Sequence, residues 1–157
     1  MYVDDKLIVS GGVSAAGAVT FQTVTGSSAV KSTNCVDLGT NRDVGEGEDL
    51  YARILVGTAF AGLTGLDIEA VIADDATLTN NVVTVGAMTY VPVADLTAGA
   101  RIAFKLSPLL NKKGQRYLGL LYTPSGTGTA GTLFADFGLE VQDSSSKKGY
   151  ASGFSIK

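Results

Sequence analysis

Two groups of carboxylates are the residues in this chain whose spacing could support chemistry. The segment Arg42–Asp49 holds four carboxylates and one arginine among glycines, and carboxylate oxygens are the ligands that calcium prefers. It lacks the regular acidic spacing of a formal calcium loop, so we interpret it as a solvated turn and leave calcium binding open. Asp74 and Asp75, with Glu69 nearby, resemble the paired acids of a glycosidase. Adjacent strand residues point to opposite faces, however, and we interpret this pair as capping a turn.

The remaining composition leaves few routes to catalysis. The 157 residues include no histidine, no tryptophan and a single cysteine, Cys35. A Ser-His-Asp triad is therefore impossible, and zinc sites of the His or Cys type are excluded. We interpret Cys35 as a small buried hydrophobe. The glycine-containing segment 125–131 has no lysine, so it is not a phosphate cradle. We expect a structural or binding protein without enzymatic activity, cofactor or assigned metal ligand.

The C-terminal segment combines cations with aromatic rings. From about residue 144 onward we expect a flexible arm, in which aromatic side chains would anchor a partner and cations would steer its approach. A terminus that stays disordered is the alternative. The preferred interface residues are Lys147, Lys148, Tyr150 and Phe154.

Length and charge restrict the class of partner. The chain fits one domain, 1–157, and a domain of this size buries enough surface to fold without disulfides. Its net charge is −3, from 12 basic and 15 acidic residues, which provides no broad cationic surface for nucleic acid or an anionic membrane. No apolar run is long enough for a membrane helix. Residues 6–18 resemble a signal peptide only loosely, and we expect a first strand there.

Apolar residues alternate with polar ones along several segments of the chain, and a period of two is typical of β-strands. The clearest case is 132–142, where we expect a half-buried strand with this inward face: Leu133, Ala135, Phe137, Leu139 and Val141. The same alternation occurs in 101–106 and 66–72. Segments 50–56 and 117–122 are apolar on both sides, so we expect a second sheet or a neighbouring subunit to cover both faces.

Glycine-rich and polar clusters divide the chain into about eight strands, and no window has a convincing helical stripe. Clusters that we interpret as turns or loops include 62–65, 79–81 and 125–131. The sequence therefore predicts an all-β fold, a β-sandwich of about eight antiparallel strands arranged as a jelly roll. An immunoglobulin-like sandwich has a similar strand count, but the Cys, Trp, Cys core typical of that fold is missing here.

Two stretches resemble a known family. Residues 36–39 with 42–51, and residues 116–154 with their Tyr-Leu-Gly, Thr-Gly-Thr and Tyr-Ala-Ser-Gly-Phe motifs, are similar to the jelly-roll capsid cement proteins of short-tailed, Bordetella-type bacteriophages. The similarity extends over most of the chain, from Leu7 to Phe154. Its motifs are turn-and-strand signatures, so no catalytic or binding residue is transferred from the family.

The resemblance implies a cement or decoration protein on the outer capsid surface of the virion, assembled in the host cytoplasm. Its partners would be the major capsid protein of an HK97-like shell and further copies of itself, as a dimer or trimer. A carbohydrate- or receptor-binding jelly-roll module of a phage tail is the alternative hypothesis, and a glycosidase is the third.

Overall fold

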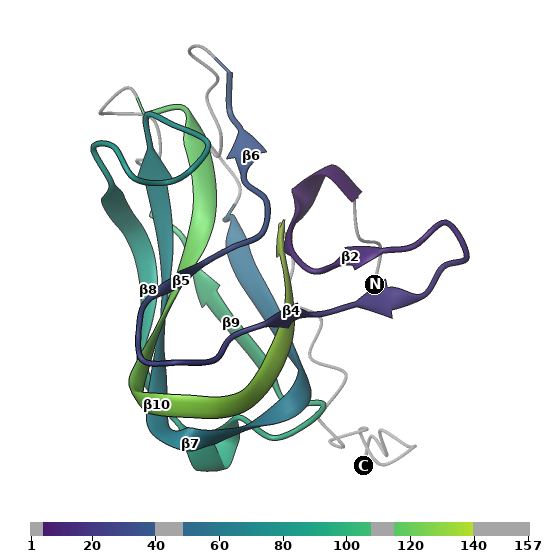
Figure 1. The fold of residues 1–157 in the computed structure, drawn as a ribbon. Coiled ribbons are helices and arrows are strands. Elements are labelled where there is room, and N and C mark those ends of the chain that lie inside the picture. The colour runs from purple at the N-terminus through teal and green to yellow at the C-terminus, as the bar shows by residue number, and fades with distance from the viewer. Residues whose placement is uncertain (1–4, 40–48, 108–114, 140–157) are drawn as a thin grey trace, which may run out of the picture.

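The computed structural model describes residues 5–39, 49–107 and 115–139 (Figure 1). Short N-terminal strands precede two very long ones. The elements in chain order are η1 (Asp5–Leu7), β1 (Ile8–Ser10), β2 (Gly12–Val13), β3 (Val19–Thr20), β4 (Gln22–Thr23), β5 (Val30–Lys31), β6 (Val36–Asp37), β7 (Tyr51–Ala73), β8 (Val83–Pro92), η2 (Val93–Asp95), β9 (Arg101–Lys105) and β10 (Tyr117–Gly138). Among the described residues, no helix is long and apolar enough to cross a membrane.

Strands β7 and β10 are antiparallel partners along their full length, from the Tyr117–Ala73 pair to the Gly138–Tyr51 pair. Figure 1 shows the two strands curving together. The register slips several times between Ser125 and Leu133, and such bulges bend a strand and increase its twist. The glycine clusters 62–65 and 125–131, for which the sequence predicts turns, therefore lie inside continuous strands. They make the bend at which one sheet folds over on itself.

The bend in the long strands produces two sheets. The first contains β9, the first half of β7, the second half of β10, and β1 with β4. The second contains β8, the second half of β7, the first half of β10, and β5 with β6. The predicted all-β sandwich of antiparallel strands is thus confirmed, and its pairing is that of a jelly roll in which each long strand contributes to both sheets.

One core lies between the two sheets. It combines side chains from both halves of the long strands, among them Ile54 and Phe137 from the first sheet and Ile68, Leu120 and Tyr122 from the second. The inward faces predicted for 66–72 and 101–106 are confirmed, since their alternate apolar residues are mostly buried. A hydroxyl pair joins the sheets through this core, with 2.7 Å between Ser10 Oγ and the Tyr122 hydroxyl oxygen.

The C-terminal strand differs from its prediction in two respects. It ends at Gly138, so Leu139 lies outside the strand and its side chain is exposed; Val141 lies outside the described residues. The strand is also buried on both faces, because Phe134 and Asp136 on the expected solvent side are covered. The cover comes from distant parts of the chain: Phe134 lies against the backbone at Gly11, and Asp136 pairs with Arg53.

Candidate interaction surface

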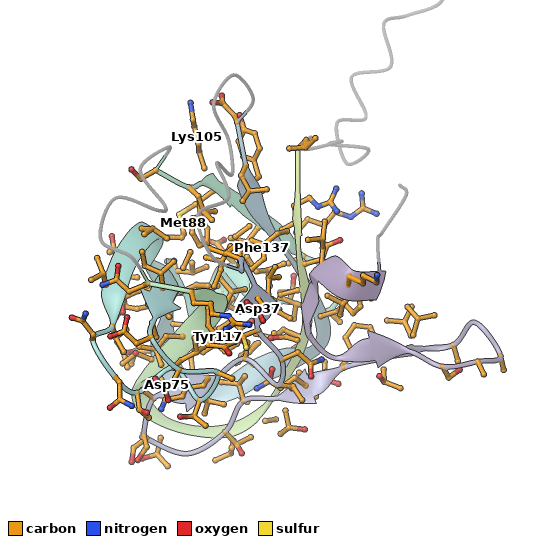
Figure 2. The ribbon with its side chains drawn as sticks, turned by 90° about the horizontal axis from the view of Figure 1, so that it is seen from above. Asp37, Asp75, Met88, Lys105, Tyr117 and Phe137 are labelled. Carbon is orange, nitrogen blue, oxygen red and sulfur yellow. The ribbon has the colours of Figure 1, made fainter. Side chains whose placement is uncertain are left out.

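The β2–β3 hairpin stands apart from the jelly-roll body. Its two strands pair only with each other, as a separate two-stranded sheet. Both views show it extending away from the body (Figures 1 and 2). Every residue from Val13 to Phe21 is exposed, and three of the six large exposed hydrophobic side chains in the described residues belong to this short segment: Val13 at 45%, Val19 at 47% and Phe21 at 39%.

Local hydrogen bonds shape the tip of the hairpin. The backbone N–H of Ser14 donates to the carbonyl of Ala18, and the N–H of Gly17 donates back to the carbonyl of Ser14, both at 2.8 Å. The Ser14 hydroxyl oxygen also accepts the N–H of Ala18 at 3.1 Å. Gly17 has a φ of +79°, a conformation that glycine adopts without steric cost. The turn is therefore well defined although nothing else in the described chain pairs with it.

Close packing fixes the base of the hairpin on the outer face of the first sheet. The ring of Phe21 lies so close to Gly57 of β7 that a Cβ there would approach ring carbons within 2.5 Å. On the other arm, Gly11 has a φ of +77° and would bring a Cβ within 2.2 Å of the Thr20 carbonyl oxygen. Glycine at both positions allows the hairpin to leave the body at a defined angle.

Charge is absent from this whole region, since every residue from Leu7 to Val30 is uncharged. An exposed, uncharged segment that carries valine and phenylalanine side chains is typical of a protein-binding element. It offers no cations for phosphates. The hairpin is thus the best candidate interaction surface among the described residues.

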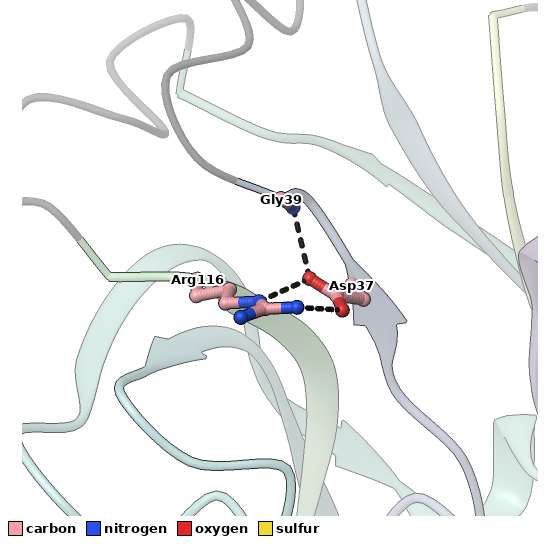
Figure 3. A network of polar contacts seen from close by, with 3 residues as sticks. All are labelled: Asp37, Gly39 and Arg116. Carbon is pink, nitrogen blue, oxygen red and sulfur yellow. Dashed lines mark hydrogen bonds and ion pairs between the residues drawn. The ribbon is translucent and has the colours of Figure 1, made fainter.

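An ion pair holds the end of the N-terminal segment against β10 (Figure 3). Arg116 Nε and one terminal nitrogen each donate to an oxygen of Asp37 at 2.6 Å, and the backbone N–H of Gly39 donates to the same carboxylate at 2.9 Å. These bonds, chiefly those from Arg116, lower the pKa of Asp37 to about 2. The Arg116 guanidinium carbon also lies 5.3 Å from the centre of the Tyr117 ring, within the range of a cation–π contact. β6 is therefore clamped to β10 by a pair that stays charged through neutral and mildly acidic pH.

A second ion pair, Arg53–Asp136, is largely buried and joins two strands of the first sheet. Arg53 of β7 donates to both oxygens of Asp136 of β10, at 2.8 and 2.6 Å. The side chains are only 14% and 1% exposed. A bidentate pair of this kind fixes the register of two neighbouring strands, and its burial makes it a structural feature of the body.

The interface residues predicted on the C-terminal arm lie outside the described residues: Lys147, Lys148, Tyr150 and Phe154. The acidic segment 42–49 is described only at its last residue. There Asp49 pairs with Lys105 of β9, with 2.5 Å between Oδ1 and Nζ, and this contact raises the pKa of Lys105. Both side chains are about half exposed.

Two of the carboxylates that resembled the paired acids of a glycosidase, Asp75 and Glu69, accept structural hydrogen bonds. Asp75 caps the turn after β7: its carboxylate accepts the backbone N–H groups of Thr79 and Asn80 at 3.0 and 2.7 Å, and the hydroxyls of Thr77 and Thr79. These bonds keep the pKa of Asp75 well below its usual range. Glu69 lies on β7 and accepts a bond from Thr84. The turn-capping interpretation is therefore confirmed for Asp75.

Asp75 is also remote from the Asp49–Lys105 ion pair, because Figure 2 shows Asp75 and Lys105 on opposite sides of the body. In the described part of the chain, no cluster of three or more acidic, cysteine or histidine residues could hold a metal ion.

Cys35 is only partly buried, which corrects the prediction of a buried hydrophobe. It packs beside a small cluster of Val71, Ala73 and Leu78 on the outer face of the second sheet. Its Sγ lies 3.5 Å from the carbonyl oxygen of Ala76. Desolvation and the nearby carboxylates raise its pKa, so the thiol is a weak nucleophile at neutral pH.

The hairpin was not predicted. The sequence predicts a first strand near the N-terminus and a turn at Gly11-Gly12, whereas the structure has β1 followed by the β2–β3 hairpin. The available signal was the uncharged run itself, with small residues and glycines between valines. Periodicity could not find it, because each hairpin strand has only two residues.

Comparison with known proteins places this chain among phage proteins. No curated protein matches it. The model of the family described as Bbp16, a name that points to Bordetella phage proteins, matches residues 13–137. The matched region begins within β2 and ends one residue before β10 does, so it includes most of the hairpin and nearly the whole jelly-roll body. The chain therefore belongs to the Bbp16 family.

Proposed function

We propose that this protein is a capsid cement protein, which binds the outside of a phage head with an HK97-like shell and bridges neighbouring major capsid subunits. The observation that carries the proposal is the geometry of the β2–β3 hairpin. A closed jelly roll of a phage protein family presents an uncharged, apolar element that extends away from the body. Such a molecule is suited to holding other proteins together and performs no catalysis in this role.

The body supplies the rigidity that bridging requires. Its long strands run through both sheets, and the ion pairs Asp37–Arg116 and Arg53–Asp136 tie segments that lie far apart in sequence. A force applied at one surface is thereby transmitted to the other with little deformation. Each copy needs to contribute only modest binding, because many copies related by the symmetry of the shell act together.

The C-terminal arm is the second proposed contact with the shell. Lys147 and Lys148 would meet acidic groups of the capsid protein, and Tyr150 and Phe154 would occupy apolar pockets. A protein with two separate contact elements can touch two subunits at once, which is the requirement for cement.

The experiment that tests this proposal is the copy number of the protein relative to the major capsid protein, measured in purified virions by quantitative mass spectrometry. A cement protein is present in near-stoichiometric amounts, and heads that lack it burst at lower temperature. A handful of copies would instead indicate a tail or receptor-binding module and contradict the cement function. Absence from virions would make the protein non-structural and overturn both.

A further inference from the structure

We propose that residues 27–37 form a strap that opens from the edge of β10 while the rest of the jelly roll stays folded. The strap contains β5 and β6, and it lies along the first half of β10 as an outer strand of the second sheet. This inference concerns a movement built into the fold, and it does not depend on the cement function.

No residue of the strap is buried, in contrast to the residues that flank it. Val24 before the strap is 0% exposed, and Leu38 after it is 6% exposed. Within the strap, Val30 and Val36 pack against the core but are only partly buried. Burial of apolar surface is the dominant stabilising contribution to a folded segment. The strap therefore adds little to the core, which is formed by the long strands behind it.

Hydrogen bonds hold the strap closed, and Ser32 makes the central ones. Its backbone N–H donates to the Leu120 carbonyl at 2.8 Å, and its hydroxyl oxygen accepts the Leu120 N–H at 3.0 Å. The Asn34 N–H donates to the Val9 carbonyl, also at 2.8 Å. Strands β5 and β6 themselves have only two residues each. When such a segment opens, water replaces most of these bonds, so each of them contributes only modestly to closure.

Both ends of the strap are fixed to the body. Just before it, Gly26 and Gly128 exchange two backbone hydrogen bonds, at 2.8 and 2.9 Å. Gly26 has a φ of +88°, which glycine adopts without steric cost. At the other end of the strap, Asp37 forms its ion pair with Arg116. The opening is therefore confined to the segment between these two anchors.

Opening of the strap bares the edge of β10 over residues 117–122. On its other side β10 stays paired with β7, in continuous register over 117–125, so the second sheet persists without the strap. A bared strand edge presents unpaired backbone N–H and C=O groups, to which a strand of another chain can add. The closed strap thus shields a sheet edge, and its opening controls access to that edge.

Native-state hydrogen exchange of the full-length protein, followed residue by residue by NMR, tests this opening. Strap amides should exchange at least about a hundredfold faster than those of residues 66–72, which lie between β8 and β10. Ile54→Val, in the core of the first sheet, should speed exchange in 66–72 about two- to tenfold. It should leave the strap amides at their wild-type rate, because the strap opens without disturbing that core.

Ser32→Ala tests whether the Ser32 hydroxyl holds the strap closed. The strap amides should exchange about two- to tenfold faster in this variant, because the closed state loses a hydrogen bond. Ser14→Ala is the matched control, since the Ser14 hydroxyl oxygen also accepts a backbone N–H, at 3.1 Å, but lies in the β2–β3 hairpin. It should leave exchange in the strap unchanged.

Two results would overturn the inference. Strap amides that exchange as slowly as those of residues 66–72, or that respond to Ile54→Val by the same factor, would show that the strap opens only when the whole protein unfolds. Unchanged strap exchange in Ser32→Ala would refute the part of the inference that assigns closure to the Ser32 hydroxyl.

Discussion

The buried hydroxyl pair between the two sheets gives a prediction that depends only on the tertiary structure. Ser10 and Tyr122 lie 112 residues apart in sequence, are both fully buried, and have their oxygens 2.7 Å apart. The perturbation is a double-mutant cycle with Tyr122→Phe, Ser10→Ala and the combined variant. Each single change removes one oxygen and leaves the other buried without this partner.

The expected magnitude follows from the cost of a buried unsatisfied hydroxyl. Tyr122→Phe should lower the free energy of unfolding by about 1–3 kcal/mol, and Ser10→Ala by a similar amount. At about 2–4 °C per kcal/mol for a chain of this size, a loss of about 2 kcal/mol lowers the melting temperature by about 4–8 °C. The double variant leaves no orphaned hydroxyl, so its loss should fall short of the sum of the single losses by about 1–2 kcal/mol.

The assay is urea unfolding of all four proteins, with Tyr90→Phe as the control. Tyr90 is 52% exposed and its hydroxyl donates only a long bond of 3.5 Å to the Thr64 carbonyl, so its removal should change stability little. A double variant as unstable as the sum of Tyr122→Phe and Ser10→Ala would show that the two hydroxyls do not interact, and would refute the reasoning.

Alkaline pH provides a second readout of the same residue. Burial raises the pKa of Tyr122 above its ordinary value, which in the unfolded chain is about 10. The unfolded state therefore releases this proton first as the pH rises. The stability contribution is fully present below about pH 10 and is lost as the pH rises from there toward the folded pKa. Tyr122→Phe should unfold with a shallower pH dependence above pH 10 than the wild type.

Three further predictions concern the bend, the covered ion pair and the C-terminal arm. Gly131→Ala should lower the free energy of unfolding in urea by more than about 2 kcal/mol, because a Cβ there would overlap the Phe60 ring of β7. Gly17→Ala introduces only the strain of a positive φ, so it should lower the free energy of unfolding by about 1 kcal/mol. Equal losses would show that the ring yields. Asp136→Asn removes the buried carboxylate that accepts two bonds from Arg53 and should lower the free energy of unfolding by about 1–3 kcal/mol. Lys105→Ala at the exposed pair should leave the melting temperature unchanged, and comparable effects of the two changes would contradict this account. Deleting residues 144–157 should preserve the melting temperature but reduce binding to heads that lack the protein, and unchanged occupancy would eliminate the arm as a contact.

The strand content of the fold could be predicted because alternation is a local property. Residues such as Leu66, Ile68 and Ile72 are spaced for one face of a strand, and the structure buries all three. The jelly-roll class also followed, since many short apolar periods with glycine-rich breaks and no helical stripe leave few other architectures.

The glycine clusters show where local signals become ambiguous. Segments 62–65 and 125–131 depart from ordinary strand conformation, with φ of +82° at Gly62 and +103° at Gly126. Glycine marks such a departure but not its direction, so a reversal of the chain and a bend in a continuous strand have the same signature. Here the two clusters face each other across the β7–β10 pairing, and that long-range partnership makes them the corner of the sheet.

The burial of side chains on the outer face of β10 could not be predicted from the sequence either. Phe134 and Asp136 alternate with core residues and therefore resembled a solvent face, yet Gly11 and Arg53 cover them. The covering residues come from segments more than 80 positions away, and no local pattern reports such a contact. In the same way, residues 7–30 by themselves determine that the N-terminal region is apolar and uncharged. Only the tertiary structure decides that β1 and β4 pair with β10 while Val13–Thr20 extends away from the body. With β1 and β4 beside β10, the two hairpin strands pair with each other.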